Sequence, residues 1–202
     1  MKWASAVSEH ADLTRAVEEC AVGVRSRLGD PAPDLAVIFV SSHYVRDYDD
    51  VARLVKEKLA TSMVFGCSTG GVIGGGSEVE NRPAVSITAA ILPGVEVVDF
   101  YLDQESLPDP DAGPATWEQL VNVSPKQDPH FVVLADPFSF QAQDLLLGLD
   151  FAFNRSVKTG GLASSADQQG RNALFLDDKV YRSGVVGLAL HGNITVDTVA
   201  AQ

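Results

Sequence analysis

The chain has 202 residues, a formal net charge of −12 and a sequence pI near 4.6. Because nucleic acids and anionic membranes are themselves negative, this charge argues against both as partners. Cys20 and Cys67 are the only cysteines, too few for a disulfide framework, and they indicate a reducing compartment. No apolar run approaches the ~20 residues of a membrane helix, and the first residues lack the apolar segment of a signal peptide. We therefore expect a cytoplasmic location.

The first half of the chain alternates helical and strand-like patterns. Apolar residues recur at 3–4 spacing after Asp12, which is typical of an amphipathic helix with an N-terminal cap. The continuous apolar run from Leu35 to Val40 is typical of a strand that is covered on both faces. Pro93-Gly94 separates two apolar runs and predicts a tight hairpin. The predicted elements are helices at 12–28 and 49–60 and strands at 35–40, 62–65, 84–92 and 95–102.

The second half has a similar order of elements and follows a stretch that we interpret as a linker. Residues 103–116 are acidic and contain Pro108, Pro110 and Pro114. An additional hairpin is predicted to turn at Asp177-Asp178-Lys179. Helices that alternate with short apolar strands are typical of an α/β fold. The predicted elements are a helix at 141–153 and strands at 131–135, 156–158, 172–176, 180–182, 188–190 and 194–197.

The spacing of these elements favours an internal duplication. Residues 90–99 align with 188–197 at a constant shift of 98 positions, and the Thr-Gly-Gly triplet at 69–71 aligns with that at 159–161 at a shift of 90. Two unrelated βα segments with a common pattern remain the alternative. The expected fold class is α/β, with duplicated (α)-β-α-β-β-β units whose mixed sheets are flanked by helices. A four-layer α-β-β-α packing is one arrangement that such units could adopt. The predicted organisation is a first repeat over about 1–102, a linker at about 103–116 and a second repeat over about 117–202.

Both Thr-Gly-Gly triplets follow a predicted strand, which is where open α/β sheets bind ligands. Glycines let the backbone approach a ligand and direct several N–H groups at one carboxylate or phosphate, and neighbouring hydroxyls add donors. Arg155, Lys158 or Arg171 could supply a positive charge. The alternative is that the glycines only permit turns or close packing. The predicted ligand-binding residues are Cys67, Ser68, Thr69, Gly70, Gly71, Thr159, Gly160, Gly161 and Ser164.

Cys67 has the setting of a nucleophile, because Gly-Cys-Ser-Thr-Gly can present a thiol on a turn and His43 could act as its base. The alternative is a buried, inert thiol. The four histidines are scattered and the cysteines lie 47 positions apart, so no metal site is predicted. Neither glycine segment matches a nucleotide-binding fingerprint, and no cofactor is predicted.

Three segments together resemble the FIST family, in particular its N-terminal domain. They are Val64-Phe-Gly-Cys-Ser-Thr-Gly-Gly71, Thr159-Gly-Gly-Leu-Ala-Ser164 and Leu174-Phe-Leu-Asp-Asp-Lys-Val-Tyr-Arg-Ser-Gly-Val185. With the flanking elements, the resemblance extends over nearly the whole chain. It implies an intracellular sensory module of signal transduction, often fused to signalling domains or an F-box, with small ligands such as amino acids. A C-terminal FIST domain normally follows in the family. The sequence stops at Gln202 without one, so we expect either a truncated chain or a single-domain member.

The function predicted from these features is reversible binding of an amino acid or another small anionic metabolite by a sensory domain. We expect a small-molecule ligand and leave open a signalling or F-box-type partner and a homo-oligomer. The alternatives are a cysteine-dependent enzyme that uses Cys67 and a non-catalytic scaffold or self-assembly module. The residue types favour binding over catalysis, because His43 is the one base that could serve Cys67.

Overall fold

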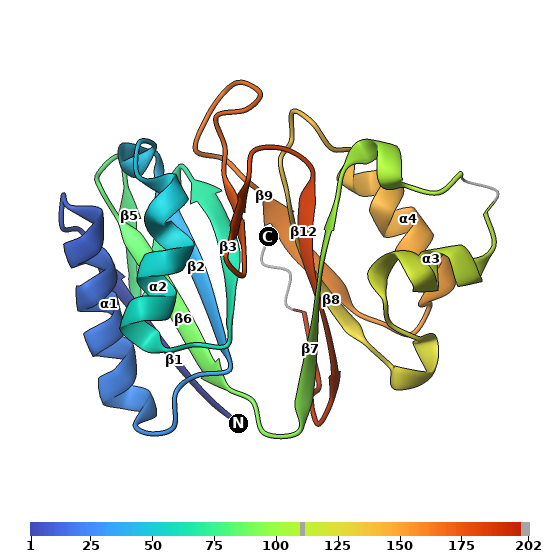
Figure 1. The fold of residues 1–202 in the computed structure, drawn as a ribbon, viewed down its shortest axis with the longest axis horizontal. Helices are drawn as coiled ribbons and strands as arrows, with labels where there is room; N and C mark the ends of the chain where they lie inside the picture. The colour runs from blue at the N-terminus through green and yellow to red at the C-terminus, as the bar shows by residue number, and fades with distance from the viewer. Residues whose placement is uncertain (110–111, 199–202) are drawn as a thin grey trace. The chain divides into compact units, whose positions relative to one another are not determined.

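The computed structural model describes residues 1–109 and 112–198, and the chain forms two compact units (Figure 1). Unit 1 consists of Met1–Leu92 and Ala163–Ser183, and unit 2 consists of Pro93–Leu162 and the chain from Gly184 onward. The chain therefore passes from one unit to the other at three places. No helix in the described part of the chain is both long and apolar enough to cross a membrane.

Unit 1 contains two helices and most of the strands. Its helices are α1 (Leu13–Leu28) and α2 (Val51–Leu59), and its strands are β1 (Lys2–Ser8), β2 (Leu35–Ser41), β3 (Met63–Thr69), β4 (Gly71–Gly74), β5 (Ser77–Glu80), β6 (Val85–Ile91), β10 (Leu174–Leu176) and β11 (Lys179–Tyr181). Six of these strands form a mixed sheet in the order β1-β6-β2-β3-β10-β11. β2 and β3 run parallel, and the other neighbours in this sheet are antiparallel. β4 and β5 form a separate hairpin.

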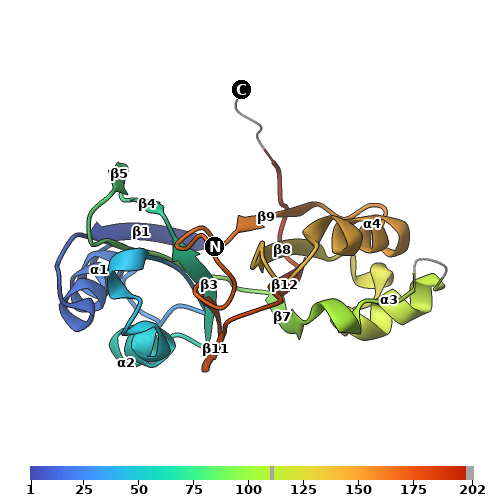
Figure 2. The same cartoon turned by 90° about the horizontal axis from the view of Figure 1, so that it is seen from above.

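Both helices of unit 1 pack on one face of its sheet (Figure 2). Alternate residues of β2, such as Ile38 and Val40, join the same buried cluster as Val17 of α1 and Val55 of α2. This alternation follows from the two-residue period of a strand. The α1 helix begins as predicted, because the Asp12 carboxylate accepts a hydrogen bond from the backbone N–H of Arg15 at 2.9 Å.

Unit 2 is a smaller version of the same architecture. Its helices are α3 (Pro114–Val121) and α4 (Ala142–Ala152), and its strands are β7 (Val95–Leu102), β8 (His130–Ala135), β9 (Lys158–Leu162) and β12 (Val185–Gly192). The sheet order is β7-β12-β8-β9, with β8 and β9 parallel and the other neighbours antiparallel. Trp117 of α3 and Leu145 of α4 join Phe131 of β8 in one buried cluster, which contains the edge-to-face pair Phe131–Phe153.

The two units share one topology, and the predicted α/β class with mixed sheets flanked by helices is confirmed. β1, β6, β2 and β3 of unit 1 correspond in order and direction to β7, β12, β8 and β9 of unit 2. Each unit also has one helix after its first strand and one after its second. Each unit thus begins with a strand. The bounds of the compact units differ from those of the repeats expected at about 1–102 and 117–202.

The prediction of a hairpin at Pro93-Gly94 is wrong. β6 and β7 flank these residues but pair in different sheets, β6 between β1 and β2 and β7 beside β12. The expected strand pair at 188–190 and 194–197 is also wrong, because β12 pairs with β7 and β8 and residues 194–197 are not in a strand. In both cases a local turn signal was outweighed by pairing between strands that are distant in sequence.

The two Thr-Gly-Gly triplets do not occupy equivalent positions. In the parallel pair of unit 1, Ile38 lies opposite Gly66, and in that of unit 2, Val133 lies opposite Gly160. A Cβ atom built on either glycine would lie 1.8 Å from the carbonyl oxygen of the residue opposite. Gly66 is therefore the counterpart of Gly160, and both glycines allow the close approach of a parallel neighbour.

Sequence patterns missed three elements, β1, the β4-β5 hairpin and α3. β1 has small side chains such as Ala4 and Ala6 where a strand pattern relies on large apolar residues. α3 begins at Pro114, inside the predicted linker, since proline is well suited to a first helical turn. Residues 110 and 111 of that linker lie outside the described residues. The additional hairpin at 172–182 is confirmed as β10-β11, although it joins the sheet of unit 1.

Candidate functional site

Two of the motif segments pack against each other within unit 1. Ser68 and Thr69 end β3, and Ala163 to Ser165 begin the segment that returns to unit 1. The backbone N–H of Ser164 donates to the Ser68 carbonyl oxygen at 3.1 Å, and that of Gly70 donates to Ser164 Oγ at 3.1 Å. These contacts bring together four of the predicted site residues, Ser68, Thr69, Gly70 and Ser164.

Ser68 belongs to a chain of buried hydrogen bonds. The backbone N–H of Ala173 donates to Ser68 Oγ at 2.8 Å, Ser68 Oγ lies 2.7 Å from Ser165 Oγ, and Ser165 Oγ lies 2.9 Å from Asn172 Oδ1. Because an amide oxygen can only accept, Ser165 donates to Asn172, and Ser68 in turn donates to Ser165. Ser68 and Asn172 are fully buried, so their hydrogen bonds hold the returning segment on β3.

The glycine-rich residues differ in how their backbone is engaged. Gly70 N donates to Ser164, and Gly71 begins β4 opposite Glu80. The triplet 159–161 is part of β9, an exposed edge strand of unit 2, so the expected second loop is a strand. Thr69 Oγ1 is buried and has no hydrogen-bond partner among the described residues. The predicted set therefore divides between unit 1, with Cys67, Ser68, Thr69, Gly70, Gly71 and Ser164, and unit 2, with Thr159, Gly160 and Gly161.

Cys67 does not have the environment of a nucleophile. Its side chain is buried within β3, and this burial raises the pKa of the thiol to about 12. His43 lies exposed in the short helical turn after β2, where its Nδ1 is 3.4 Å from Ser41 Oγ. A thiol with this pKa is neutral at pH 7, whereas nucleophilic catalysis requires the thiolate.

We expect both thiols of the folded chain to resist Ellman's reagent at pH 8. Cys20 is buried as well, and its pKa is also raised to about 12, chiefly by burial. A thiol pKa of about 12, in place of the ordinary 9.0, lowers the thiolate fraction about 1,000-fold. Labelling should therefore be about 1,000-fold slower than for a free thiol, and both thiols should react at once in 6 M guanidinium. One rapidly labelled thiol that disappears in Cys67→Ala would restore Cys67 as a reactive residue.

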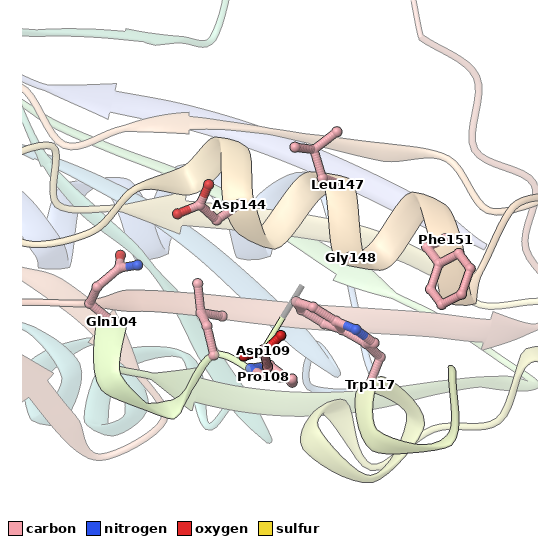
Figure 3. A pocket seen from close by; sticks show the side chains of 9 residues that line it. Gln104, Pro108, Asp109, Trp117, Asp144, Leu147, Gly148 and Phe151 are labelled. Atoms are coloured by element: carbon pink, nitrogen blue, oxygen red, sulfur yellow. The ribbon is translucent and has the colours of Figure 1, made fainter. Parts of the chain in front are cut away.

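Unit 2 contains a cleft (Figure 3). It has a volume of about 450 Å³ and lies between α4, α3 and the segment that follows β7. Trp117 reaches into it from α3, and Phe151 borders it from α4. The lining residues are Gln104, Leu107, Pro108, Asp109, Trp117, Asp144, Leu147, Gly148 and Phe151.

One face of α4 forms a wall of this cleft. Asp144 and Gly148 are four residues apart, as are Leu147 and Phe151, and the two pairs are offset by three residues, so all four share one side of the helix. The absence of a side chain at Gly148 leaves room for the Trp117 ring, since a Cβ atom there would lie 2.1 Å from the ring. Leu147 and Phe151 are 61% and 60% exposed, which leaves an apolar surface open to a ligand.

The described residues contain no cluster of three or more His, Cys, Asp or Glu side chains that could hold a metal ion.

A family model for the FIST N domain matches residues 34–202. The chain belongs to the FIST N domain family. The FIST N domain is a sensory module of signal-transduction proteins.

Two mycobacterial relatives resemble this FIST N domain along almost its whole length. The uncharacterized protein Rv0628c of Mycobacterium tuberculosis (strain ATCC 25618 / H37Rv) is 30% identical over 194 residues, which are 96% of this chain and 49% of the relative. The uncharacterized protein Mb0898c of Mycobacterium bovis (strain ATCC BAA-935 / AF2122/97) is 28% identical over 189 residues, 94% of this chain and 47% of the relative. The chain thus spans about half the length of the curated relatives it matches.

The cleft of the FIST N domain was not predicted from the sequence. Its segment after β7 lies in the predicted linker, and the buried leucines of α4, Leu145 and Leu149, do not line it. The signal that could have found it is the second stripe of α4, in which Leu147 and Phe151 extend the apolar surface beyond what one buried face requires.

Proposed function

We propose that this FIST N domain senses a small metabolite that binds reversibly in the cleft of unit 2. The supporting observation is the cleft itself, with its volume of about 450 Å³, its apolar wall and its few polar groups. Small-molecule sites usually have volumes of roughly 300–1,000 Å³, mostly apolar linings and a few polar groups that orient the ligand. The family resemblance implies a small ligand, with amino acids as one example, and does not assign it to a particular site.

The glycine-motif residues are a second candidate location, for a small anionic metabolite. The buried Thr69 Oγ1 without a hydrogen-bond partner in the described chain supports it. The Ser68 hydroxyl and the Gly70 N–H already form hydrogen bonds within the protein, which supports a structural role for these two residues instead. The cysteine-enzyme alternative loses its main support, because the Cys67 thiol is buried and its pKa is raised to about 12.

A thermal-shift screen with amino acids, organic acids, amines and nucleotides at millimolar concentration tests the proposal. A ligand at 100 times its Kd stabilises the folded state by about 2.7 kcal/mol, which raises the Tm of a chain of this size by roughly 5–10 °C. Phe151→Ala should abolish most of this shift, since it removes an exposed wall of the cleft. Val22→Ala is the matched control, because Val22 is an equally exposed apolar residue of a helix in unit 1.

The same screen separates the two locations. A shift that survives Phe151→Ala and is lost in Thr69→Val, which removes one hydroxyl with little change of shape, would place the ligand at the motif segments. The absence of a shift with every compound class would contradict ligand binding and favour the scaffold alternative.

A further inference from the structure

Among its described lining residues, the cleft of unit 2 has two carboxylates, Asp109 and Asp144, and no basic side chain. Gln104 contributes the remaining polar side chain, and its Oε1 already accepts a hydrogen bond from Gln141 N at 2.7 Å. The polar groups of the lining that carry charge are therefore both negative. A ligand that enters this cleft meets charges of a single sign.

The surrounding chain strengthens this negative field. The sequence has no lysine or arginine between Arg82 and Lys126, nor between Lys126 and Arg155, and these stretches include α3, α4 and the segment after β7. The basic residues that follow α4 have acidic partners, since Lys158 Nζ lies 2.8 Å from Asp150 Oδ1 and Arg155 Nη2 lies 3.8 Å from Asp128 Oδ2. An acidic cleft in an acidic protein concentrates cations and repels anions.

Two aromatic rings line the cleft together with the carboxylates. Trp117 and Phe151 line the same cleft from α3 and α4 (Figure 3). Aromatic faces attract cations through their quadrupole, tryptophan most strongly, and they also provide apolar contact area. Leu107 and Leu147 add further apolar surface. The combination of aromatic rings, aliphatic walls and carboxylates suits a molecule that is both cationic and apolar.

We propose that the cleft binds a small organic ammonium ion with an apolar body and no carboxylate group. Its ammonium group pairs with Asp144 and Asp109, and its apolar body packs on Trp117, Phe151 and Leu147. This inference rests on the proposed function, because it names the ligand class of the same cleft. It also requires that anions, including simple carboxylic acids, bind there more weakly than amines of the same size.

Three probes of matched shape test the charge preference: phenethylamine as the cation, 2-phenylethanol as the neutral compound and 3-phenylpropanoate as the anion. Binding is followed by isothermal titration calorimetry and by Trp117 fluorescence in a Trp3→Phe background, since these are the two tryptophans of the chain. We expect phenethylamine to bind at least about 10-fold more tightly than 3-phenylpropanoate, and added salt to weaken phenethylamine binding.

Substitutions of the two aspartates test whether their carboxylates cause the preference for the cation. Asp144→Asn and Asp109→Asn should each weaken phenethylamine binding about 5-fold and leave 2-phenylethanol binding unchanged, a loss at the upper end of what one exposed ion pair contributes. Glu78→Gln makes the same change of charge on β5 of unit 1 and should alter neither. Far-ultraviolet circular dichroism of Asp144→Asn checks that α4 is intact, because Asp144 lies in its first turn.

The outcomes separate this inference from the proposed function. Binding of 2-phenylethanol or 3-phenylpropanoate as tight as that of phenethylamine overturns the ammonium preference and leaves small-molecule binding in the cleft standing. No binding by any of the three probes also overturns it, and the metabolite screen with Phe151→Ala then decides the proposed function on its own. Equal loss of binding in Glu78→Gln would show that the charge effect does not come from the cleft.

Discussion

Replacing Gly66 by alanine is expected to lower the free energy of unfolding by about 3 kcal/mol, at the upper end of what overpacking costs. The added Cβ would lie 1.8 Å from the Ile38 carbonyl oxygen and 2.8 Å from its carbon. These are backbone atoms of the strand beside β3, so no side-chain rotation relieves the contact. β2 and β3 would have to separate in the middle of the six-stranded sheet, with loss of ladder hydrogen bonds. Urea denaturation followed by far-ultraviolet circular dichroism measures the change.

Gly160→Ala should cost a similar amount in unit 2, and it provides a test of the shared topology. Its Cβ would meet the Val133 carbonyl oxygen at the same 1.8 Å, and its φ of 152° is rare for residues with a side chain. Gly161→Ala is the matched control, because a Cβ there has no neighbour within 4 Å and Gly161 is the next residue of the same strand. If Gly66→Ala and Gly160→Ala changed the unfolding free energy no more than Gly161→Ala, the close approach of the parallel strands would be contradicted.

Gly148→Ala is expected to destabilise unit 2 by about 1–3 kcal/mol and to narrow the cleft. The new methyl group would lie 2.1–2.4 Å from three atoms of the Trp117 ring, which is almost completely buried. The ring is rigid, so it must turn as a whole, and the space beside it is the cleft that it lines. In a Trp3→Phe background the emission of Trp117 should shift toward longer wavelength, because the displaced ring becomes more exposed to water.

A double-mutant cycle with Trp117→Leu assigns the effect to this contact. Trp117→Leu alone leaves a cavity and is itself destabilising. When the larger ring is absent, Gly148→Ala should cost less than about 0.5 kcal/mol, so the two substitutions are strongly non-additive. Gly113→Ala, at a site without neighbours within 4 Å just before α3, is the control for adding a methyl group. Additive effects of Gly148→Ala and Trp117→Leu would contradict the packing described for α3 and α4.

Much of the local structure could be predicted from the sequence. α1, α2 and α4 have clear amphipathic spacing, and the runs around Leu35 and Phe131 are apolar enough to be strands. The pairing of strands could not be predicted in the same way. β6 and β7 are adjacent in sequence and separated by a good turn, yet β1 and β12 are their partners. Turn signals act over a few residues, whereas the choice of partner depends on which buried faces fit together.

The candidate site was harder to predict than the fold. The glycines and hydroxyls of the motifs predict an anion site. In the structure, however, Gly66 and Gly160 allow close strand packing and Ser68 belongs to a chain of hydrogen bonds. The cleft depends on α3, and α3 starts within a proline-rich stretch that does not have the pattern of a helix. A site formed by a helix face and an irregular segment has no fixed residue spacing in sequence.

The repeated crossing of the chain between its units affects the order in which the protein can fold during synthesis. β3 cannot gain its neighbour β10 until the ribosome has made residues 93–162, which belong to the other unit. β12, which lies between β7 and β8, is made last among the strands of the described residues. Until β10 has been made, β3 has an unpaired edge, and until β12 has been made, β7 and β8 have unpaired edges. Unpaired strand edges are prone to association. The nascent chain should therefore depend on chaperones most strongly before β10 emerges, when both sheets still have unpaired edges.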